Sequence, residues 1–377
     1  MARDINARLN SLNTRRRGLD RLDRLTEDAS AQIVRKSFIQ EAWQKRAVGK
    51  PHSQYAIGAM QAVDPDYTRI GVETADRVSK QLAAGLTTSV EFRLQGSVPL
   101  DVHVRGVSDV DLLTLDTTFY TYATFGVRST QGYYTNPTTR TSLGVLGDLR
   151  RQAEPLLKTK YPAATVDCSG GKCIALSGGS LARPVDVVPA HWNDTMAYQA
   201  SGAEHDRGVT ILNKKVPETI DNLPFTHIKR VHDRDGEALG GLKKAIRLTK
   251  NVKNDAENEA RAEKLPSFDI AALLYHADKT ALMIGYLYEL NILIETRRFL
   301  DWCWANPTEA GKLRTPCGSR FILDSDAKRD GLLAISMEMD DLARRVAIEH
   351  VPSLGIGTPT WPEVEAALKG AVIAEAA

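Results

Sequence analysis

Two aspartates, Asp109 and Asp111, alternate along a stretch that reads VSDVDLLTLD. Side chains two residues apart on a strand project from the same face, so both carboxylates would lie side by side. Leu113 and Leu115 continue that face in apolar form. Neighbouring like charges raise each other's pKa unless a cation lies between them. Mg²⁺ supplies that charge, because it binds through a few carboxylates and leaves positions for phosphate oxygens. The pattern predicts a magnesium site at the start of this strand.

A third acid, Asp186, lies within the apolar run RPVDVVPA, which also reads as a strand. A buried aspartate among β-branched residues needs a partner. If the two strands are neighbours, the three carboxylates converge and can hold two metal ions for in-line phosphoryl transfer. One ion would lower the pKa of an attacking hydroxyl group, and the other would neutralise charge on the leaving pyrophosphate. The expected cofactor is therefore two Mg²⁺ ions, with Mn²⁺ as a substitute.

Residues suited to phosphate precede the acids. Gln95, Gly96 and Ser97 end the strand EFRLQ, and the Asp-x-Asp pattern begins twelve residues after the serine. Glycine lets the backbone approach a phosphate closely, and serine donates hydroxyl and amide hydrogen bonds. Pro99 suits the first turn of a helix, whose N-terminus would then face a triphosphate. This order of features indicates a nucleotidyltransferase site, whereas acids in a solvated loop are the alternative.

The surrounding periodicity predicts the elements that position these residues. Up to about residue 192, segments with apolar residues at helical spacing predict helices, and segments in which apolar and polar residues alternate predict strands. The expected helices cover about residues 19–47, 66–86 and 142–158, and the expected strands cover residues 89–96, 109–116, a hairpin over 163–179, and 182–192. A long helix followed by strands and one interrupting helix predicts an α/β lobe with a mixed sheet.

From about Glu237 the chain is expected to be mostly helical, beginning with DGEALGGLKKAIRLTKNVKN and LPSFDIAALLYHA. The predicted fold class is therefore α+β, with two lobes. We expect a catalytic lobe with a mixed β-sheet and a long N-terminal helix over residues 1–230, and a helical bundle over 231–377.

The composition of the chain narrows the class of protein further. The 377 residues are 42% hydrophobic and 25% charged, with a formal net charge of +2, so no strong field attracts nucleic acid or membranes. The run Arg15 to Arg17 is interpreted as a solvated helix face. Four cysteines occur without zinc spacing, which favours reduced, structural thiols. Neither an apolar signal core nor a long apolar stretch is present, so a cytoplasmic protein without membrane contact is expected.

With these residues in place, the sequence resembles the DNA polymerase β-like nucleotidyltransferase superfamily. Within it, the chain is similar to the cGAS/DncV-like group, the bacterial CD-NTases, from about Leu19 to His350. The resemblance rests on a helix before LQGS, on the three aspartates, and on AIRLTKNVKN and LPSFDIAALL in the helical lobe. The segment NLPFTHIKRVHDRDG also resembles the family, and His227 within it is given no catalytic role, because metal-activated transfer needs no histidine base.

The resemblance assigns further nucleotide-binding positions. It implies that Lys250 and Ser267 contact the triphosphate and that the Phe268 ring stacks on a base. Each has a simpler interpretation: an exposed helix lysine, a plain helix N-cap, and a core aromatic residue. Arg105, between the serine and the first aspartates, could reach phosphate or serve only the surface.

The resemblance also implies a function. The expected enzyme is a Mg²⁺-dependent nucleotidyltransferase that makes a cyclic di- or oligonucleotide from nucleoside triphosphates in CBASS anti-phage defence. The product, and not this chain, would bind a downstream effector, and accessory proteins could engage the C-terminus. The zinc ribbon of the animal branch is missing, which argues against activation by nucleic acid. The alternatives are a polymerase-like or protein-modifying nucleotidyltransferase and a catalytically silent nucleotide-binding module.

Overall fold

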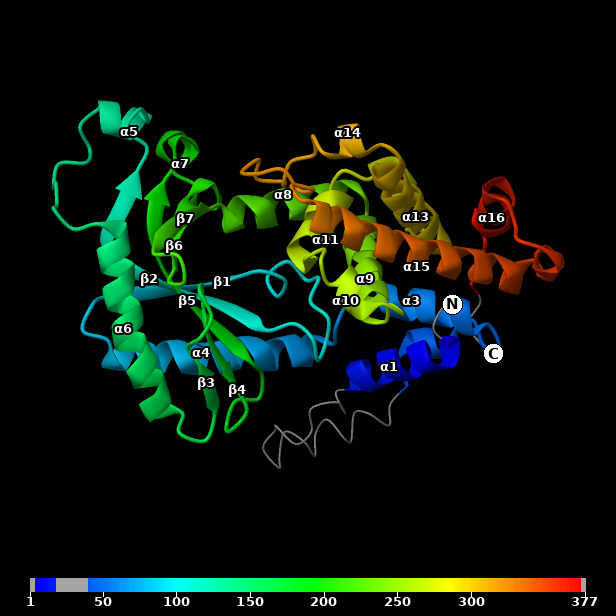
Figure 1. Ribbon diagram of the computed structural model, residues 1–377, viewed down its shortest axis with the longest axis horizontal. Coiled ribbons are helices and arrows are strands. Elements are labelled where there is room, and N and C mark those ends of the chain that lie inside the picture. Colours follow the sequence, from blue (N-terminus) through cyan, green and yellow to red (C-terminus); the bar gives the residue numbers. More distant parts are fainter. Residues whose placement is uncertain (1–3, 18–39, 374–377) are drawn as a thin grey trace.

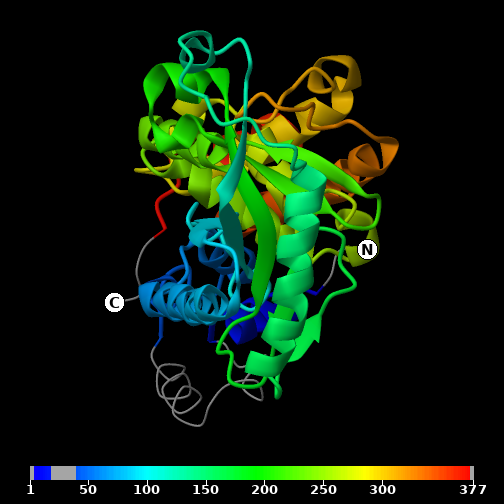
Figure 2. The ribbon, with the colours of Figure 1, turned by 90° about the vertical axis from the view of Figure 1, so that its left-hand side faces the viewer.

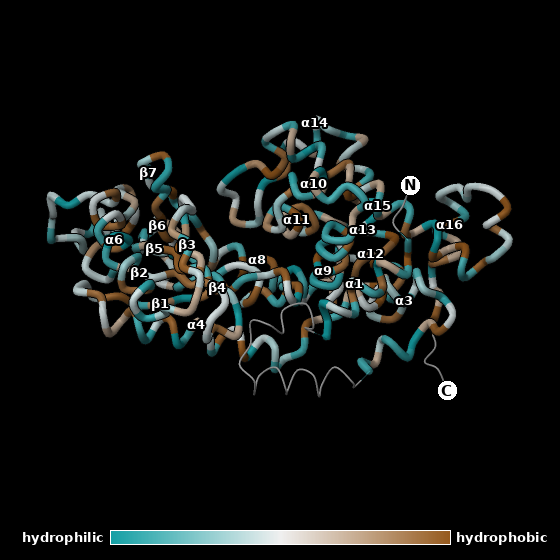
Figure 3. The backbone as a smooth tube through the Cα atoms, turned by 60° about the horizontal axis from the view of Figure 1, so that its bottom comes forward, coloured by the Kyte–Doolittle hydropathy of each residue, from teal (hydrophilic) through white to brown (hydrophobic). Residues whose placement is uncertain are grey.

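The computed structural model describes residues 4–17 and 40–373. Two lobes lie side by side, one built around a β-sheet and the other from helices (Figure 1). Coloured by hydropathy, the apolar segments gather inside each lobe separately (Figure 3). The two-lobed α+β class expected from the sequence is confirmed.

The sheet lobe contains the elements from α4 to β7. Their bounds are α4 Pro65–Gly85, β1 Val90–Gln95, β2 Val110–Tyr122, α5 Val127–Thr130, α6 Ser142–Lys160, β3 Thr165–Asp167, β4 Ile174–Ser177, β5 Val185–Asp194, α7 Met196–Ser201, the 3-10 helix η3 Glu204–Asp206, β6 Gly208–Asn213 and β7 Glu218–Asn222.

The helical lobe begins with α8, which leads out of the sheet (Figure 1). Its elements are α8 Pro224–Glu237, α9 Gly241–Asn254, α10 Glu259–Ala262, α11 Ser267–Leu274, α12 Lys279–Ile284, α13 Leu290–Ala305, α14 Pro307–Ala310, α15 Asp326–His350, η4 Pro352–Ile356 and α16 Trp361–Leu368. The first described elements, α1 Ile5–Arg17, η2 Ala42–Lys45 and α3 Pro51–Met60, precede the sheet lobe in sequence. Residues of α1 and α3 share one apolar core with α9, α13 and α15.

The sheet is mixed, as the sequence predicted. Its order is β1-β2-β5-β4-β3, and β6 and β7 extend it from β5. Strands β2 and β5 run parallel, whereas β1 is antiparallel to β2. Strands β4 and β6 pair with successive halves of β5, both antiparallel. The long strands β2 and β5 therefore form the centre of the sheet (Figure 2).

The two faces of the sheet carry different cores. Leu112 and Val187 pack with α4 and α6 on one face. Leu113 and Val188 belong to a separate apolar cluster on the other face. Because side chains alternate along a strand, residues of the same parity as Leu113 and Val188 share that second face. Asp111 and Asp186 have this parity, so both leave the sheet on the face opposite to α4 and α6.

Two predictions about helices need correction. The helix expected over 19–47 falls largely outside the described residues, and within 40–47 the chain forms the 3-10 helix η2 instead of an α-helix. No helix starts at Pro99: residues 96–101 form turns, in which Val102 N donates to Ser97 O at 3.0 Å. A proline permits a first helical turn, but this loop is fixed by contacts with distant helices instead.

The interpretation of the run Arg15 to Arg17 as a solvated helix face is wrong for Arg15, whereas Arg17 is exposed. Arg15 is buried and donates two hydrogen bonds, of 2.8 and 2.6 Å, to the two carboxylate oxygens of Asp255. The Tyr55 hydroxyl donates to the same carboxylate at 2.8 Å. Bidentate guanidinium–carboxylate pairs are strong and directional. This network ties α1 to α3 and α9 inside the helical lobe.

All four cysteines are free thiols, as expected. None of the described helices combines the length and the apolarity that a membrane crossing requires.

Candidate functional site

The strand register brings two of the predicted acids together. Asp111 of β2 and Asp186 of β5 are direct partners in the parallel pair. Neighbouring strands lie about 4.8 Å apart, so the two carboxylates sit beside each other on one face. Asp109 directly precedes β2 and has the same parity. The prediction that the strand of Asp186 runs beside the strand of Asp111 is confirmed.

The three carboxylates interact electrostatically, and burial and this interaction together raise the pKa values of Asp111 and Asp186. The pKa of Asp111 is raised to about 7, first by burial and then by the charges of Asp186 and Asp109. Burial also raises the pKa of Asp186, and the charge of Asp109 adds to the effect. The Cys173 thiol hydrogen-bonds to Asp186 and partly offsets this rise. Carboxylates that cost free energy to ionise together are a site for a positive charge.

The residues present fit a divalent cation in their chemistry. Carboxylate oxygens are the ligands that Mg²⁺ prefers. Asp111 and Asp186 lie opposite each other on two neighbouring strands, and Asp109 lies two residues before Asp111. The carboxylates are not already arranged around a cation position. Among the described residues, no group of three His, Cys, Asp or Glu side chains is placed to hold a metal ion. Asp109, Asp111 and Asp186 are the groups that would hold the metal.

Gly96 brings the backbone against this acidic group. Gln95 is the antiparallel partner of Asp111, so the chain leaves β1 directly beside the carboxylate. Gly96 has a φ of 77°, a left-handed conformation that glycine adopts without strain. A Cβ atom at this position would overlap Oδ2 of Asp111. Both the turn and the close approach therefore require glycine, and they place Ser97 next to the acids.

One cavity collects nearly all the predicted nucleotide-binding residues. Its volume is about 350 Å³, and it opens between the sheet lobe and helices α8, α9 and α11. The predicted residues that line it are Gln95, Gly96, Ser97, Asp109, Asp111, Lys250, Ser267 and Phe268. Asp186 is not part of its lining; it lies opposite Asp111 in the strand register, and its charge affects the pKa of Asp111. The cavity thus joins a phosphate-binding turn to paired carboxylates.

Lys250 is a buried residue of this cavity, so its interpretation as an exposed helix lysine is wrong. Its side chain is 4% exposed, and Nζ donates to Val102 O at 2.7 Å. Burial and, to a smaller extent, the charge of Lys253 lower its pKa to about 8, although the charge of Asp111 offsets part of the shift. An ammonium group carries three donors, so the remaining ones are available to a phosphate.

The loop between Ser97 and Asp109 is held from the helical lobe. Arg247, also buried on α9, donates to Asp101 O at 2.8 Å and to Met60 O at 2.8 Å. Asp101 has a φ of 55°, which is strained for a residue with a Cβ atom. His232 of α8 lies 3.1 Å from Pro99 O through Nε2. These contacts fix the loop, and therefore Ser97, without a helix at Pro99.

Ser267 and Phe268 stand at the start of α11, on the cavity wall. The N-cap of α11 is Pro266 and Ser267 is the first helical residue, so the interpretation of Ser267 as the N-cap is wrong. Phe268 is 39% exposed, which rules out its interpretation as a core residue. Its ring stacks on His227, with ring centroids 4.4 Å apart and an interplanar angle of 27°.

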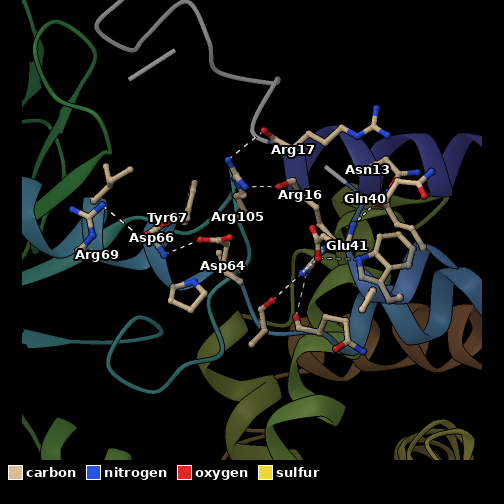
Figure 4. A pocket seen from close by; sticks show the side chains of 18 of the residues that line it. Asn13, Arg16, Arg17, Gln40, Glu41, Asp64, Asp66, Tyr67, Arg69 and Arg105 are labelled. Carbon is tan, nitrogen blue, oxygen red and sulfur yellow. Dashed lines mark hydrogen bonds and ion pairs between the residues drawn. The ribbon is translucent and has the colours of Figure 1, made fainter. Parts of the chain in front are cut away.

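A larger cavity, of about 630 Å³, contains none of the three acids. It lies between the end of α1 and the start of α4 (Figure 4). Arg105 lines this cavity, donates to the backbone oxygens of Arg16 and Arg17, and stacks 4.6 Å from the Tyr67 ring centroid. Arg105 therefore contacts the protein away from the acids and does not line their cavity.

Sequence reasoning missed other residues of the acidic cavity. Asn222, at the end of β7, and Asn254, at the end of α9, both line it. His227 lines it as well, although the sequence gave this residue no role in the chemistry. Isolated amides and histidines in polar stretches carry no spacing signal, so only the fold could assign them to this site.

Comparison with curated proteins finds clear relatives, although no family model matches the chain. The "Cyclic dinucleotide synthase CdnE" of Yersinia aleksiciae is 40% identical over 356 residues, which cover 92% of this chain and 93% of that protein. The "c-di-GMP synthase" of a Lachnospiraceae bacterium is 31% identical over 242 residues, covering 59% of this chain and 68% of that protein.

Solved structures share the fold. The STING-associated CdnE c-di-GMP synthase from Capnocytophaga granulosa superposes with a TM-score of 0.67 at 25% identity, over 90% of this chain and 97% of that one. The STING-associated CdnE c-di-GMP synthase from Flavobacteriaceae sp. gives a TM-score of 0.68 at 24% identity, over 80% of this chain and 87% of that one.

Proposed function

Since this chain belongs to the bacterial CD-NTases, the family of the CdnE cyclic dinucleotide synthases, we propose that its acidic cavity joins two nucleoside triphosphates into a cyclic dinucleotide. Family membership makes the chain a nucleotidyltransferase. The observation that carries the proposed assignment of the site is the register of Asp111 opposite Asp186, beside the Gly96–Ser97 turn.

Each side chain then has a role that follows from its position. Ser97 donates to the phosphates of the donor nucleotide from a turn that glycine brings close to the acids. Lys250 adds a buried positive charge, and Ser267 adds a hydroxyl group at the start of a helix, where anions are favoured. The base of the donor lies against Phe268, since a half-exposed ring offers a stacking surface.

Asp109, Asp111 and Asp186 would hold the divalent cations. When bound, such cations lower the pKa of the acceptor hydroxyl group and stabilise charge on the leaving group. The ribose hydroxyl oxygen of one nucleotide attacks the α-phosphorus of the other, and the bond to pyrophosphate breaks. A second transfer of the same kind, after the linear intermediate is repositioned, closes the ring and releases a second pyrophosphate. The three aspartates keep the hydroxyl and the α-phosphate aligned throughout.

The cellular role is proposed from the same family. The cyclic product would act in CBASS anti-phage defence by switching on a separate effector, and accessory proteins would engage the C-terminal end of the chain. Because three relatives are named c-di-GMP synthases, GTP is the first substrate to test.

The test is incubation of the purified chain with Mg²⁺ and labelled ATP, GTP, CTP and UTP, followed by phosphatase treatment and mass spectrometry. We expect a phosphatase-resistant cyclic dinucleotide that D111N fails to make. The matched control is D76N, because Asp76 is an exposed residue of α4 whose ion pair with Lys80 is also exposed. Label on RNA ends or on protein would instead support a polymerase-like or protein-modifying enzyme, and nucleotide binding without turnover would support a silent module.

A further inference from the structure

His227 stands out on the wall of the acidic cavity. It belongs to the first turn of α8, and its backbone N–H donates to Leu223 O at 3.1 Å. The side chain is 4% exposed and stacks on the more exposed Phe268. The imidazole therefore forms the inner part of the wall, and the phenyl ring covers it from the solvent side.

Among the described residues, Nδ1 of the His227 ring has no hydrogen-bond partner, and the atom is buried. All eight histidines lie in the described residues, and every other one has a ring nitrogen within hydrogen-bond or ion-pair distance of a protein group there. Buried polar groups are normally satisfied, because leaving one unpaired costs free energy. A phenylalanine or leucine would fill the same space without that cost, and on the wall of the cavity this nitrogen is available to a partner from outside the chain.

The charge state of the imidazole limits what that partner is. Burial and the nearby Arg320 guanidinium lower the pKa of His227 to about 4, so the ring is neutral near pH 7. Arg320 lies 5.4 Å from the Phe268 ring centroid, which places this positive charge beside the stack. A neutral imidazole offers one N–H donor and one acceptor nitrogen. It suits a neutral ring with polar edges better than it suits a phosphate.

We infer that His227 contacts the nucleobase and favours purines, its ring N–H donating to N7 of adenine or guanine in the cavity. N7 is an acceptor in both purines, and pyrimidines have no equivalent atom. His227 and Phe268 both line the cavity and stack on each other, so a base that lies against the exposed part of the phenyl ring also lies beside the imidazole. The inference rests on the proposed function, because it takes the cavity as the nucleotide site, and it adds a residue that selects the base.

The test compares equilibrium binding of ATP and GTP with that of 7-deaza-ATP and 7-deaza-GTP, which replace N7 by a carbon. Wild-type protein should bind the better of the two purines about tenfold more tightly than its 7-deaza form, the effect of one lost hydrogen bond. H227F keeps a ring for the stack and removes both nitrogens, so it should bind the two forms equally. H227Q restores a donor and should regain part of the discrimination. H205F is the matched control, since His205 is exposed and outside the cavity.

The outcomes separate the inference from the proposed function. Equal binding of purine and 7-deazapurine by the wild type, or unchanged discrimination in a folded H227F, would overturn the role of His227 while leaving nucleotide transfer intact. If H227F does not fold, the wild-type and H227Q measurements decide the matter alone. Failure of wild-type protein to bind any nucleotide or to form product would instead remove the proposed function.

Discussion

Replacing Asp111 by asparagine should stabilise the metal-free protein while it abolishes catalysis. In the folded chain, burial of this carboxylate and the nearby charges of Asp186 and Asp109 raise its pKa from 3.8 to about 7. The shift of about three pKa units corresponds to roughly 4 kcal/mol at most, the cost of keeping the group ionised above pH 7. Asp111 keeps partial contact with water, so we expect D111N to raise the free energy of unfolding by about 2 kcal/mol at pH 8.

The pH dependence has a defined sign. A carboxyl group with a raised folded-state pKa takes up a proton on folding between about pH 4 and pH 7. The stability of metal-free wild-type protein should therefore rise as the pH falls through 7 toward 4. Since asparagine cannot titrate, the advantage of D111N should shrink over the same interval and nearly vanish at pH 4.5.

The assay is urea unfolding in EDTA at pH 8 and at pH 5, followed by far-UV circular dichroism. D76N should stay within about 0.5 kcal/mol of wild type, as exposed substitutions usually do. Adding Mg²⁺ at pH 8 should reverse the order, because a cation that binds only the folded protein stabilises it by mass action. If D111N is no more stable than wild type at pH 8 without metal, the carboxylates do not repel one another as described.

Three further substitutions test the rest of the site. Gly96→Ala places a Cβ atom against Asp111 in a left-handed turn, so activity should fall more than about a hundredfold while the far-UV spectrum is retained; near-normal turnover would contradict the close approach. Ser97→Ala should raise KM for nucleoside triphosphate about tenfold by removing one phosphate donor, as measured by steady-state kinetics, and an unchanged KM would remove its phosphate role. Lys250→Met should abolish activity and also lower the free energy of unfolding by about 1 to 3 kcal/mol, because Val102 O loses its buried donor. A loss of activity with no change in urea unfolding would show that the contact with Val102 contributes nothing to stability.

Local patterns in the sequence predicted α4, α6 and the strands from β1 to β5 of the sheet lobe, but not β6 and β7. Alternation identified β2 and β5 and the faces on which Asp111 and Asp186 stand, because side-chain parity is a local property of a strand. The glycine before Ser97 was predictable as a close-approach position, and its left-handed φ agrees. What alternation alone could not supply was the register that sets Asp111 opposite Asp186, because these strands are far apart in the chain.

The burial of charged side chains was the main feature of the structure that the sequence did not predict. An exposed helix lysine was one interpretation of Lys250, yet Arg247 and Lys250 are both buried and donate to backbone carbonyls of the loop between Ser97 and Asp109. Arg15 was taken as solvated for the same reason and instead forms a buried pair with Asp255. Composition predicts that charged residues are exposed on average. Composition does not show which charged residues are buried, or which loop carbonyl or carboxylate accepts their hydrogen bonds in the folded chain.

The loop after Ser97 shows how distant contacts override local signals. Pro99 is compatible with a first helical turn, but its carbonyl lies 3.1 Å from His232 Nε2 of α8. Arg247 holds the next part of the loop at Asp101. These partners lie more than a hundred residues away in sequence, so no local rule could have found them.

The most direct test of the account is the position of Mn²⁺ in a crystal of the chain soaked with Mn²⁺ and a non-hydrolysable ATP or GTP analogue, located by anomalous scattering. We predict a peak within coordination distance of Asp109 and Asp111, on the side of Asp186, with the triphosphate against Ser97 and Lys250. A bound triphosphate elsewhere, or Mn²⁺ without contact to these carboxylates, would contradict it.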